Sequence, residues 1–497
     1  MFPETSDHGL SIMYVLTKIA SLKTADQFRA HVKKLGIELN IDDGVHQPSG
    51  SPLLAPIAWQ GRNIGNRIAV QPMEGWDGTT SGGITEPMLR RWSRFGESGA
   101  KLIWGGEAMA VRPDGRANPN QLILTEENRD GIATLLHALR QSHREHWGAD
   151  EDLIVGFQLT HSGRFCRPND HHRWEPRIAH RHPLLDQKFG IADDKPLLTE
   201  EEIQKLIQDF VKAAKLAQAI GADFVDIKCC HGYLLHEFLS ARSRNDAFGG
   251  SLENRARLPI EIARAIRRAA PSLGLGMRLS ASDTVPFEPD PSTAVSGKLG
   301  QGRPRDFRHL LPYTWGFGLD PDDPSQGDLS EPLQFIRWME NEGVSLLNVT
   351  LGSPYYTPHL LRPAAFPPSD GYQPHEDPLI SVSKHFQVTR EIKKNFSNLV
   401  VVGSGYSYLQ EFMPAAALHN VRTGGTDLMG LGRTVLSYPK VMLDAVLDGK
   451  SQRKLVCRTF SDCTTAPRNG QPSGCYPLDD FYKGTEVAEK VLKLRNG

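Results

Sequence analysis

Eight short apolar segments, most of them followed by a polar loop and a helix-like stretch, constrain the fold of this chain more than any other feature. The segments are apolar throughout rather than alternating, which is typical of strands covered on both faces. Eight strand–helix units in series predict an α/β fold, a closed parallel (β/α)8 TIM barrel, with a doubly wound open sheet as the alternative. The predicted strands begin at Ile68, Lys101, Leu153, Asp223, Leu275, Leu346, Leu399 and Asp427.

Three segments do not fit this repeat. Residues 1–50 form an N-terminal extension, in which the stretch from Ile12 to Leu35 has helical apolar spacing. Residues 51–450 contain the barrel, interrupted at 282–330 by a long segment rich in Pro, Gly and Asp. Because this insertion follows the fifth strand, we expect it on the catalytic face of the barrel. Residues 451–497 form a tail with three cysteines.

Composition excludes several classes of protein. The 497 residues carry a formal net charge of −1, which gives no electrostatic reason to expect nucleic acid or an anionic membrane as a partner. No apolar run approaches the roughly 20 residues that span a bilayer, and the N-terminus lacks the pattern of a secretory signal. Six cysteines are too few for a disulfide framework in so long a chain. We therefore expect a soluble, cytoplasmic enzyme acting on a small molecule, and leave open whether it forms a homo-oligomer.

Glycines at the ends of the last two strands indicate a phosphate site. Gly403 and Gly405 end the seventh strand, and Gly432 and Arg433 end the eighth. Glycine lets an anion approach backbone N–H groups, and the loops after strands seven and eight are the usual phosphate site of a barrel. Either segment alone could be a tight turn, but their pairing favours phosphate binding.

Polar side chains stand at the ends of three other strands. Gln158 ends the third strand and Arg278 the fifth; Arg278 is either part of a structural ion pair or a fixed positive charge beside an electron-rich ring. Lys228, His231 and Tyr233 follow one another where the fourth strand leaves the barrel. One of these three could hold a substrate oxygen while another delivers a proton.

The motifs AVQPMEGWDG, GGEAMAV, QLTHSGR, HGYLLHEFLS, MRLS and LGLGR occur in this order on the predicted strands. Together they resemble the Old Yellow Enzyme family of NAD(P)H:flavin oxidoreductases, over the chain from Ala55 to Lys450. The resemblance implies noncovalently bound FMN that is reduced by NADH or NADPH. The reduced flavin N5 then gives hydride to a second substrate, typically an alkene conjugated to an electron-withdrawing group.

The resemblance also implies roles for single residues. Those expected against the isoalloxazine ring are Gln71, Pro72, Met73 and Glu74, with a backbone contact at Ala108. Gln158 matches the residue at the pyrimidine edge, and Arg278 the one near N1 and O2. Gly405, Gly432 and Arg433 match phosphate contacts. Tyr233 matches the proton donor, and Lys228 and His231 the pair that binds substrate. Beside these, Trp76 and Tyr356 could form an aromatic pocket wall, with ordinary packing as the alternative.

Two departures from the family pattern concern the pocket. Lys228 stands where the family usually has His, and because an ammonium binds oxyanions well, we predict a substrate with an anionic group such as a carboxylate. Glu74 stands where the family often has Thr or Cys near flavin O4. Its carboxyl group is expected to be protonated, to disfavour the anionic reduced flavin, or to pair with Lys228.

The third departure lies in the tail, which resembles a degenerate form of the cluster motif of 2,4-dienoyl-CoA reductase and trimethylamine dehydrogenase. These larger relatives bind an iron–sulfur cluster through four cysteines. Here Cys457, Cys463 and Cys475 remain, and Phe460 stands where the second cysteine is expected. A four-iron cluster normally needs four thiolates, so we expect none. Ordinary thiols, or a zinc site with a fourth ligand from elsewhere, stay open.

The leading functional hypothesis is an FMN-dependent ene-reductase. Its nearest variant is an FMN-dependent dehydrogenase or demethylase that uses the same flavin in the oxidative direction. A different class is a barrel lyase in which Lys228 forms a Schiff base. Gln158 and Arg278 at flavin-edge positions argue against the lyase.

Overall fold

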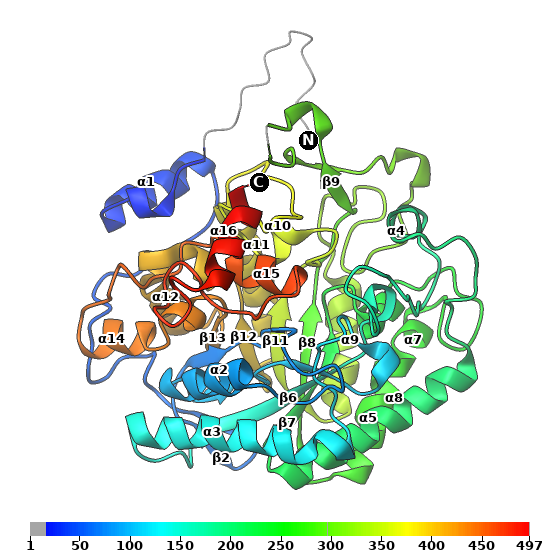
Figure 1. Ribbon diagram of the computed structural model, residues 1–497, viewed down its shortest axis with the longest axis horizontal. Helices are drawn as coiled ribbons and strands as arrows, with labels where there is room; N and C mark the ends of the chain where they lie inside the picture. The colour runs from blue at the N-terminus through cyan, green and yellow to red at the C-terminus, as the bar shows by residue number, and fades with distance from the viewer. Residues whose placement is uncertain (1–15, 296, 497) are drawn as a thin grey trace.

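The computed structural model describes residues 16–295 and 297–496, and their centre is a closed barrel of parallel strands (Figure 1). The pairing of the last strand with the first, Gly430 opposite Ala69, closes the barrel and confirms the predicted fold and its eight strands. In chain order these strands are β3 (Ile68–Val70), β4 (Leu102–Ile103) with β5 (Ala108–Ala110), β6 (Ile154–Thr160), β7 (Phe224–Cys229), β8 (Gly274–Ser280), β11 (Val344–Thr350), β12 (Val400–Gly403) and β13 (Leu428–Leu431).

The second barrel strand is interrupted, because β4 and β5 both pair with β6 but are separated by a bend. Gly105 lies in this bend at φ +114°, and a Cβ atom there would stand 2.7 Å from the backbone nitrogen of Gln158. Only glycine allows both this backbone conformation and this approach. The bend therefore lets β5 run close beside the segment that carries Gln158.

Helices surround the barrel and bury one face each against it (Figure 1). In α5, Thr199 and Glu202 form a reciprocal capping box, and the apolar side chains of Ile203, Leu206, Ile207 and Phe210 are buried. The outer helices are α2 (Glu86–Glu97), α3 (Arg129–Trp147), α5 (Glu200–Ile220), α8 (Arg257–Ala269), α9 (Ser330–Asn341), α11 (Pro378–Asn395), α12 (Met413–Arg422) and α14 (Val441–Leu447).

The N-terminal extension is only partly helical, and its residues 1–15 lie outside the described part of the chain. In the described part of the stretch from Ile12 to Leu35, which begins at residue 16, the α-helix is α1 (Ala25–Leu35), and the side chain of Thr24 caps it. The ring of Phe28 stacks on Phe412 with 4.5 Å between centroids. This contact gives the extension its partner surface on the barrel.

The insertion and the tail both have structure of their own. Within residues 282–330, β9 (Phe287–Pro289) pairs antiparallel with β10 (Gly302–Pro304). The tail forms α15 (Asp462–Arg468) and α16 (Glu486–Asn496), which lie side by side over the end of the barrel (Figure 1). No helix within the described residues combines the length and the apolarity that crossing a bilayer requires.

Candidate active site

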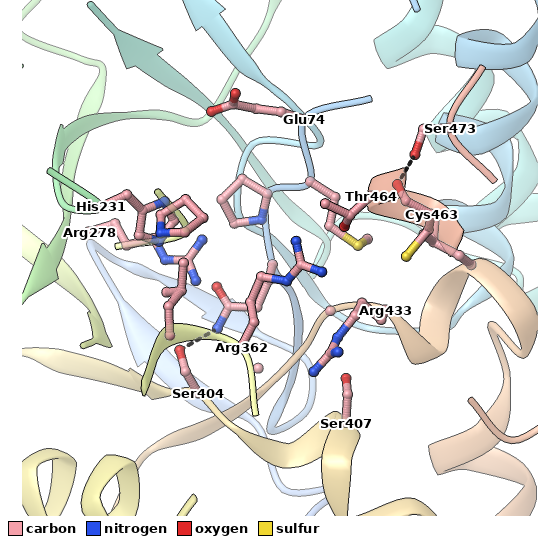
Figure 2. A pocket seen from close by; sticks show the side chains of 18 of the residues that line it. Glu74, His231, Arg278, Arg362, Ser404, Ser407, Arg433, Cys463, Thr464 and Ser473 are labelled. Carbon is pink, nitrogen blue, oxygen red and sulfur yellow. Dashed lines mark hydrogen bonds between the residues drawn. The ribbon is translucent and has the colours of Figure 1, made fainter. Parts of the chain in front are cut away.

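A cavity opens at the C-terminal ends of the strands, where the predicted site residues meet (Figure 2). Every barrel strand except β4–β5 and β11 supplies a lining residue at or just beyond its end, and the loop after β11 adds others. The predicted residues that line this cavity are Gln71, Pro72, Met73, Glu74, Trp76, Gln158, Lys228, His231, Tyr233, Arg278, Gly405, Gly432 and Arg433.

Gln158 and Arg278 stand together on one side of the cavity, and a buried carboxylate holds both in place. Asp226 in β7 accepts hydrogen bonds from the Gln158 side chain and, at 2.6 Å, from the backbone nitrogen of Arg278. Burial raises the pKa of Asp226, which the hydrogen bonds from Gln158 and Trp104 oppose. The sequence analysis missed Asp226, although a carboxylate inside an otherwise apolar strand was a signal for it.

The guanidinium of Arg278 is buried without a compensating acid. It forms no ion pair with any described residue, and its Nε atom has no hydrogen-bond partner among them. Burial lowers the pKa of the Arg278 guanidinium. A buried cation of this kind is costly unless a ligand supplies the missing partner. Of the two interpretations made from the sequence, the geometry favours a charge directed at a ligand over a structural ion pair.

Gln71 marks the floor of the cavity between β3 and β13. Its amide oxygen accepts a hydrogen bond from Asn348 at 2.6 Å, and its amide nitrogen donates to Ser404 at 3.2 Å. A Cβ atom on Gly430 would lie 1.9 Å from that nitrogen and 2.6 Å from the carbonyl oxygen of Gly403. Gly430 is therefore required for Gln71 to reach this position.

Two arginines stand at the other end of the cavity (Figure 2). Arg433 donates one hydrogen bond to the carbonyl of Pro363 at 2.7 Å, and its Nη1 atom is buried without a partner in the described residues. Burial, with the positive charge of Arg433 as a further cause, lowers the pKa of Arg362 to about 9. Two close cations and the hydroxyl groups of Ser404 and Ser407 suit a phosphate. The sequence analysis missed Arg362.

Glu74 organises the opposite wall, and it pairs with Lys228 as one of the sequence-based alternatives held. The other carboxylate oxygen accepts hydrogen bonds from the hydroxyl of Tyr233 and from the indole of Trp76, each at 2.9 Å. The ammonium of Lys228 also lies 3.8 Å from the centroid of the Tyr233 ring. Burial is the main cause that raises the pKa of Tyr233, and Glu74 adds to it. The phenol therefore stays protonated in the resting site.

His231 projects into the cavity from a strained backbone (Figure 2). Its φ of +68° lies in the left-handed region, which non-glycine residues seldom occupy outside functional sites. Burial lowers the pKa of the ring well below its usual value, so the imidazole is neutral. Its Nε2 atom is buried and has no partner in the described part of the chain. This atom can hydrogen-bond a ligand.

Three predicted residues do not line the cavity. Tyr356 turns away from it and donates a hydrogen bond of 2.6 Å to Asp283 in the insertion. Its neighbour Tyr355 lines the cavity instead, with its hydroxyl 3.0 Å from that of Tyr233. Ala108 and Gly403 lie in the strands below the cavity. Tyr355 and Tyr356 lie in a turn after β11, where no sequence periodicity shows which of the two rings faces the cavity.

The insertion and the three tail cysteines occupy different positions relative to the cavity. The described residues of the insertion, 282–295 and 297–330, do not line the cavity, and Asp283 packs behind it. Cys463 lines the cavity, whereas Cys457 and Cys475 are buried in the tail. Among the described residues these three sulfur atoms do not gather within the 4.8 Å that a shared metal ion requires. They are free thiols.

The tail covers the phosphate end of the cavity and is anchored from below. The lining includes Cys463, Thr464, Pro467, Arg468 and Ser473. The backbone nitrogen of Ser473 donates to Asp77 at 3.1 Å, and Asp77 forms a buried ion pair with Arg91. The tail is thus joined to the first loop of the barrel.

Comparison with known proteins agrees with this geometry. The model of the NADH:flavin oxidoreductase / NADH oxidase family matches residues 52–293. An NADPH dehydrogenase from Bacillus subtilis (strain 168) is 26% identical over 393 residues, which are 78% of this chain and 92% of that protein. Over residues 52–293 the chain is similar to the NADH:flavin oxidoreductase / NADH oxidase family. It is an NAD(P)H:flavin oxidoreductase enzyme of the Old Yellow Enzyme type, with FMN as its cofactor.

Solved structures share the fold of this oxidoreductase. 2-Naphthoyl-CoA reductase in complex with 2-naphthoyl-CoA superposes with a TM-score of 0.61 at 18% identity, over 88% of this chain and 58% of that one. An old yellow enzyme homologue from Zymomonas mobilis superposes with a TM-score of 0.53 at 18% identity, over 79% of this chain and 91% of that one.

The residues present fit FMN. Arg278 Nε and Arg433 Nη1 are buried donors without a partner in the described chain, and they stand at opposite ends of one cavity. A flavin phosphate offers an electron-rich ring edge at one end and a dianion at the other. Gln158 and Gln71 add amide groups that can read the ring edge.

Proposed function

We propose that this oxidoreductase passes hydride from NADH or NADPH to a small activated alkene, and that Tyr233 protonates the carbon opposite the hydride. FMN, when bound, supplies the ring that accepts and returns the hydride. The observation that carries the proposal is the position of the Tyr233 hydroxyl. It lies in the same cavity as Gln158 and Arg278 and is held by Glu74 at 2.9 Å.

The surrounding charges suit proton delivery from this phenol. Glu74 holds the hydroxyl in place, and burial keeps the phenol protonated before reaction. As the proton leaves, negative charge develops on the ring of Tyr233, and the ammonium of Lys228 at 3.8 Å from its centroid stabilises it. Lys228 is therefore expected to assist the proton donor.

His231 is proposed to bind the electron-withdrawing group of the substrate. Its Nε2 atom is buried, without a partner among the described residues, and belongs to a neutral ring. A hydrogen bond from this nitrogen to a carbonyl oxygen would draw electrons from the alkene and orient it. The strained backbone at φ +68° keeps the ring directed into the cavity.

A carboxylate on the substrate remains part of the proposal, but Lys228 supports it less than its sequence position suggests. The ammonium is already paired with Glu74, so a substrate anion must compete with that carboxylate. Neutral and carboxylated enones should be compared on the wild type and on the double variant Lys228→Met/Glu74→Gln. Equal losses on both substrates reject a special role for the carboxylate.

Three further points belong to the proposal. A Schiff-base lyase requires a free amine, and the nitrogen of Lys228 is instead held by Glu74. The site does not favour the oxidative dehydrogenase over the reductase. The reductive direction is proposed because Tyr233 is placed to donate a proton to the substrate. All six cysteines are free thiols, which supports work in the reducing cytoplasm.

The test separates the two half-reactions in a stopped-flow experiment. In Tyr233→Phe, reduction by NADPH or NADH should change less than about 3-fold, whereas reoxidation by 2-cyclohexenone should slow by about 10²–10⁴-fold. The matched control is Tyr356→Phe, which loses a hydroxyl bonded to Asp283 outside the cavity and should leave both rates unchanged. Unchanged reoxidation in Tyr233→Phe, with FMN bound, would exclude Tyr233 as the proton donor.

A further inference from the structure

A second, smaller cavity lies behind the arginine end of the flavin site. It measures about 30 Å³, room for about one water molecule, and Arg362 and Arg468 separate it from the first cavity by lining both. Its wall contains His359 of α10 (Pro358–Leu361), together with His375 and Glu376 from the segment before α11. Neither the flavin chemistry nor the proposed proton transfer uses these three residues.

One potential ligand atom from each of His359, His375 and Glu376 lies within 4.8 Å of the other two. Within residues 16–295 and 297–496 no other group of His, Cys, Asp or Glu satisfies this criterion. Two imidazoles and a carboxylate are a common donor set for zinc, with a fourth position left to water. The adjoining cavity is large enough for that water.

The hydrogen bonding of the two imidazoles suits metal binding. The hydroxyl of Tyr372 is 2.6 Å from His359 Nδ1, which fixes that nitrogen and leaves Nε2 for a ligand. His375 Nδ1 is buried and has no partner in the described residues.

An aromatic ring covers part of this half-buried group. The ring of Phe287, from β9 of the insertion, lies 4.5 Å from the His359 ring and 5.0 Å from the His375 ring. The two imidazoles themselves are 4.6 Å apart at an interplanar angle of 76°. Such packing restrains the ring orientations, as the surroundings of metal ligands do.

Charged side chains near the two imidazoles determine which metal ion the group is expected to bind. Glu376 favours a cation, whereas Lys384 acts on both imidazoles as a positive charge and Arg362 and Arg468 line the same cavity. These three cations weaken the binding of a dication, so affinity must come from the soft imidazole donors rather than from net charge. Hard cations that prefer oxygen should therefore bind poorly.

We propose that His359, His375 and Glu376 bind one zinc-class transition-metal dication through two imidazole nitrogens and one carboxylate. Zinc–nitrogen bonds are about 2.0–2.1 Å, so small side-chain rotations must bring the three donors closer together than they stand now. The ion would tie α10 to the segment that precedes α11. Because Arg362 directly follows α10, the ion would also fix the position of that arginine at the flavin cavity.

The test uses the FMN-loaded full-length protein without a histidine tag, stripped of metal by a chelator. Calorimetric titration with Zn²⁺ should give one site per chain, and Mg²⁺ should give no binding. His359→Gln and His375→Gln should each lose at least about 100-fold in zinc affinity, and Glu376→Gln about 10-fold. The matched control is His309→Gln, an exposed histidine of the insertion, which should bind as the wild type does.

Titration with Co²⁺ distinguishes metal bound by the proposed ligands from metal bound by the cysteines of the tail. The proposed site predicts visible bands of tetrahedral or five-coordinate cobalt without sulfur-to-metal charge transfer, whereas Cys457, Cys463 and Cys475 would add that charge transfer. FMN content and the thermal melting curve show whether each variant is folded. Three results would each overturn the proposal. They are a lack of stoichiometric Zn²⁺ binding, the appearance of sulfur-to-metal charge transfer with Co²⁺, and wild-type zinc affinity in folded His375→Gln.

Discussion

The two halves of the flavin cavity are built in different ways. The half that contains Gln71, Gln158 and Arg278 rises from barrel strands, whose pairing fixes each residue relative to its neighbours. The half that contains Arg468 and Ser473 comes from the tail, which reaches the cavity through docking on Asp77. Hydrogen-bonded strand ends are rigid, so we expect cofactor affinity to depend mainly on the first half and protection of the cavity mainly on the second.

The largest expected effect comes from closing the floor of the strand-built half. In Gly430→Ala the new Cβ would stand 2.6 Å from the carbonyl oxygen of Gly403, a backbone atom that cannot turn aside. Overpacking of this kind costs about 3 kcal/mol, so FMN affinity should fall about 100-fold in a fluorescence titration of the apoprotein. Gly131→Ala in α3 is the control, because its nearest neighbour is the Ile84 side chain at 3.4 Å. Equal affinities in the two variants would contradict the close approach at Gly430.

Removing one arginine from each half of the cavity tests which half determines FMN affinity. Arg278→Met should weaken FMN binding about 30-fold, because this buried cation has no ion-pair partner among the described residues and gives its charge to the ligand. Arg468→Met should weaken binding less than about 3-fold, because Arg468 is paired with Asp370. The same fluorescence titration measures both. A larger loss in Arg468→Met would reverse the division between the halves.

What the sequence could predict follows this same division. The strand ends were predictable because a repeated apolar pattern fixes where each barrel strand stops, and so Gln158 and Arg278 were found. Arg362 and Tyr355 were missed, because they lie in the loop after β11, where no periodicity shows which side chain faces the cavity. Asp226 was missed because its role depends on neighbours in other strands. Docking of the tail depends on the contact between Ser473 and Asp77, which are 396 residues apart.

A smaller effect is expected from loosening the tail. Asp77→Asn weakens the buried pair with Arg91 and the bond from the Ser473 backbone, which should lower the free energy of unfolding by about 1–2 kcal/mol. Urea unfolding measures this loss, and limited proteolysis should show faster cleavage of the tail. FMN affinity should stay within about 3-fold of the wild type. A large loss of FMN with an intact tail would show that the first loop, not the tail, was disturbed.

The smallest expected effect on FMN binding lies outside the cavity, at Asp283 behind Tyr356. Burial raises the pKa of Asp283 from 3.8 to about 6, so the folded protein holds a proton that the unfolded chain releases. Stability from this group is therefore present below the lower value and is lost as the pH rises towards the higher one. In Asp283→Asn that loss, about 3 kcal/mol for a pKa raised by about 2, should disappear from the melting curves between these values. An unchanged pH slope would contradict a raised pKa.

The central claim is that this barrel mouth binds FMN and that a nicotinamide reduces it there. The direct measurement is an absorbance spectrum of purified protein equilibrated with FMN and freed of excess, followed by anaerobic titration with NADPH and NADH. The account predicts one FMN per chain and bleaching of the flavin band by at least one of the two donors. Protein that circular dichroism shows to be folded, yet that stays colourless after FMN is supplied in excess, would contradict it.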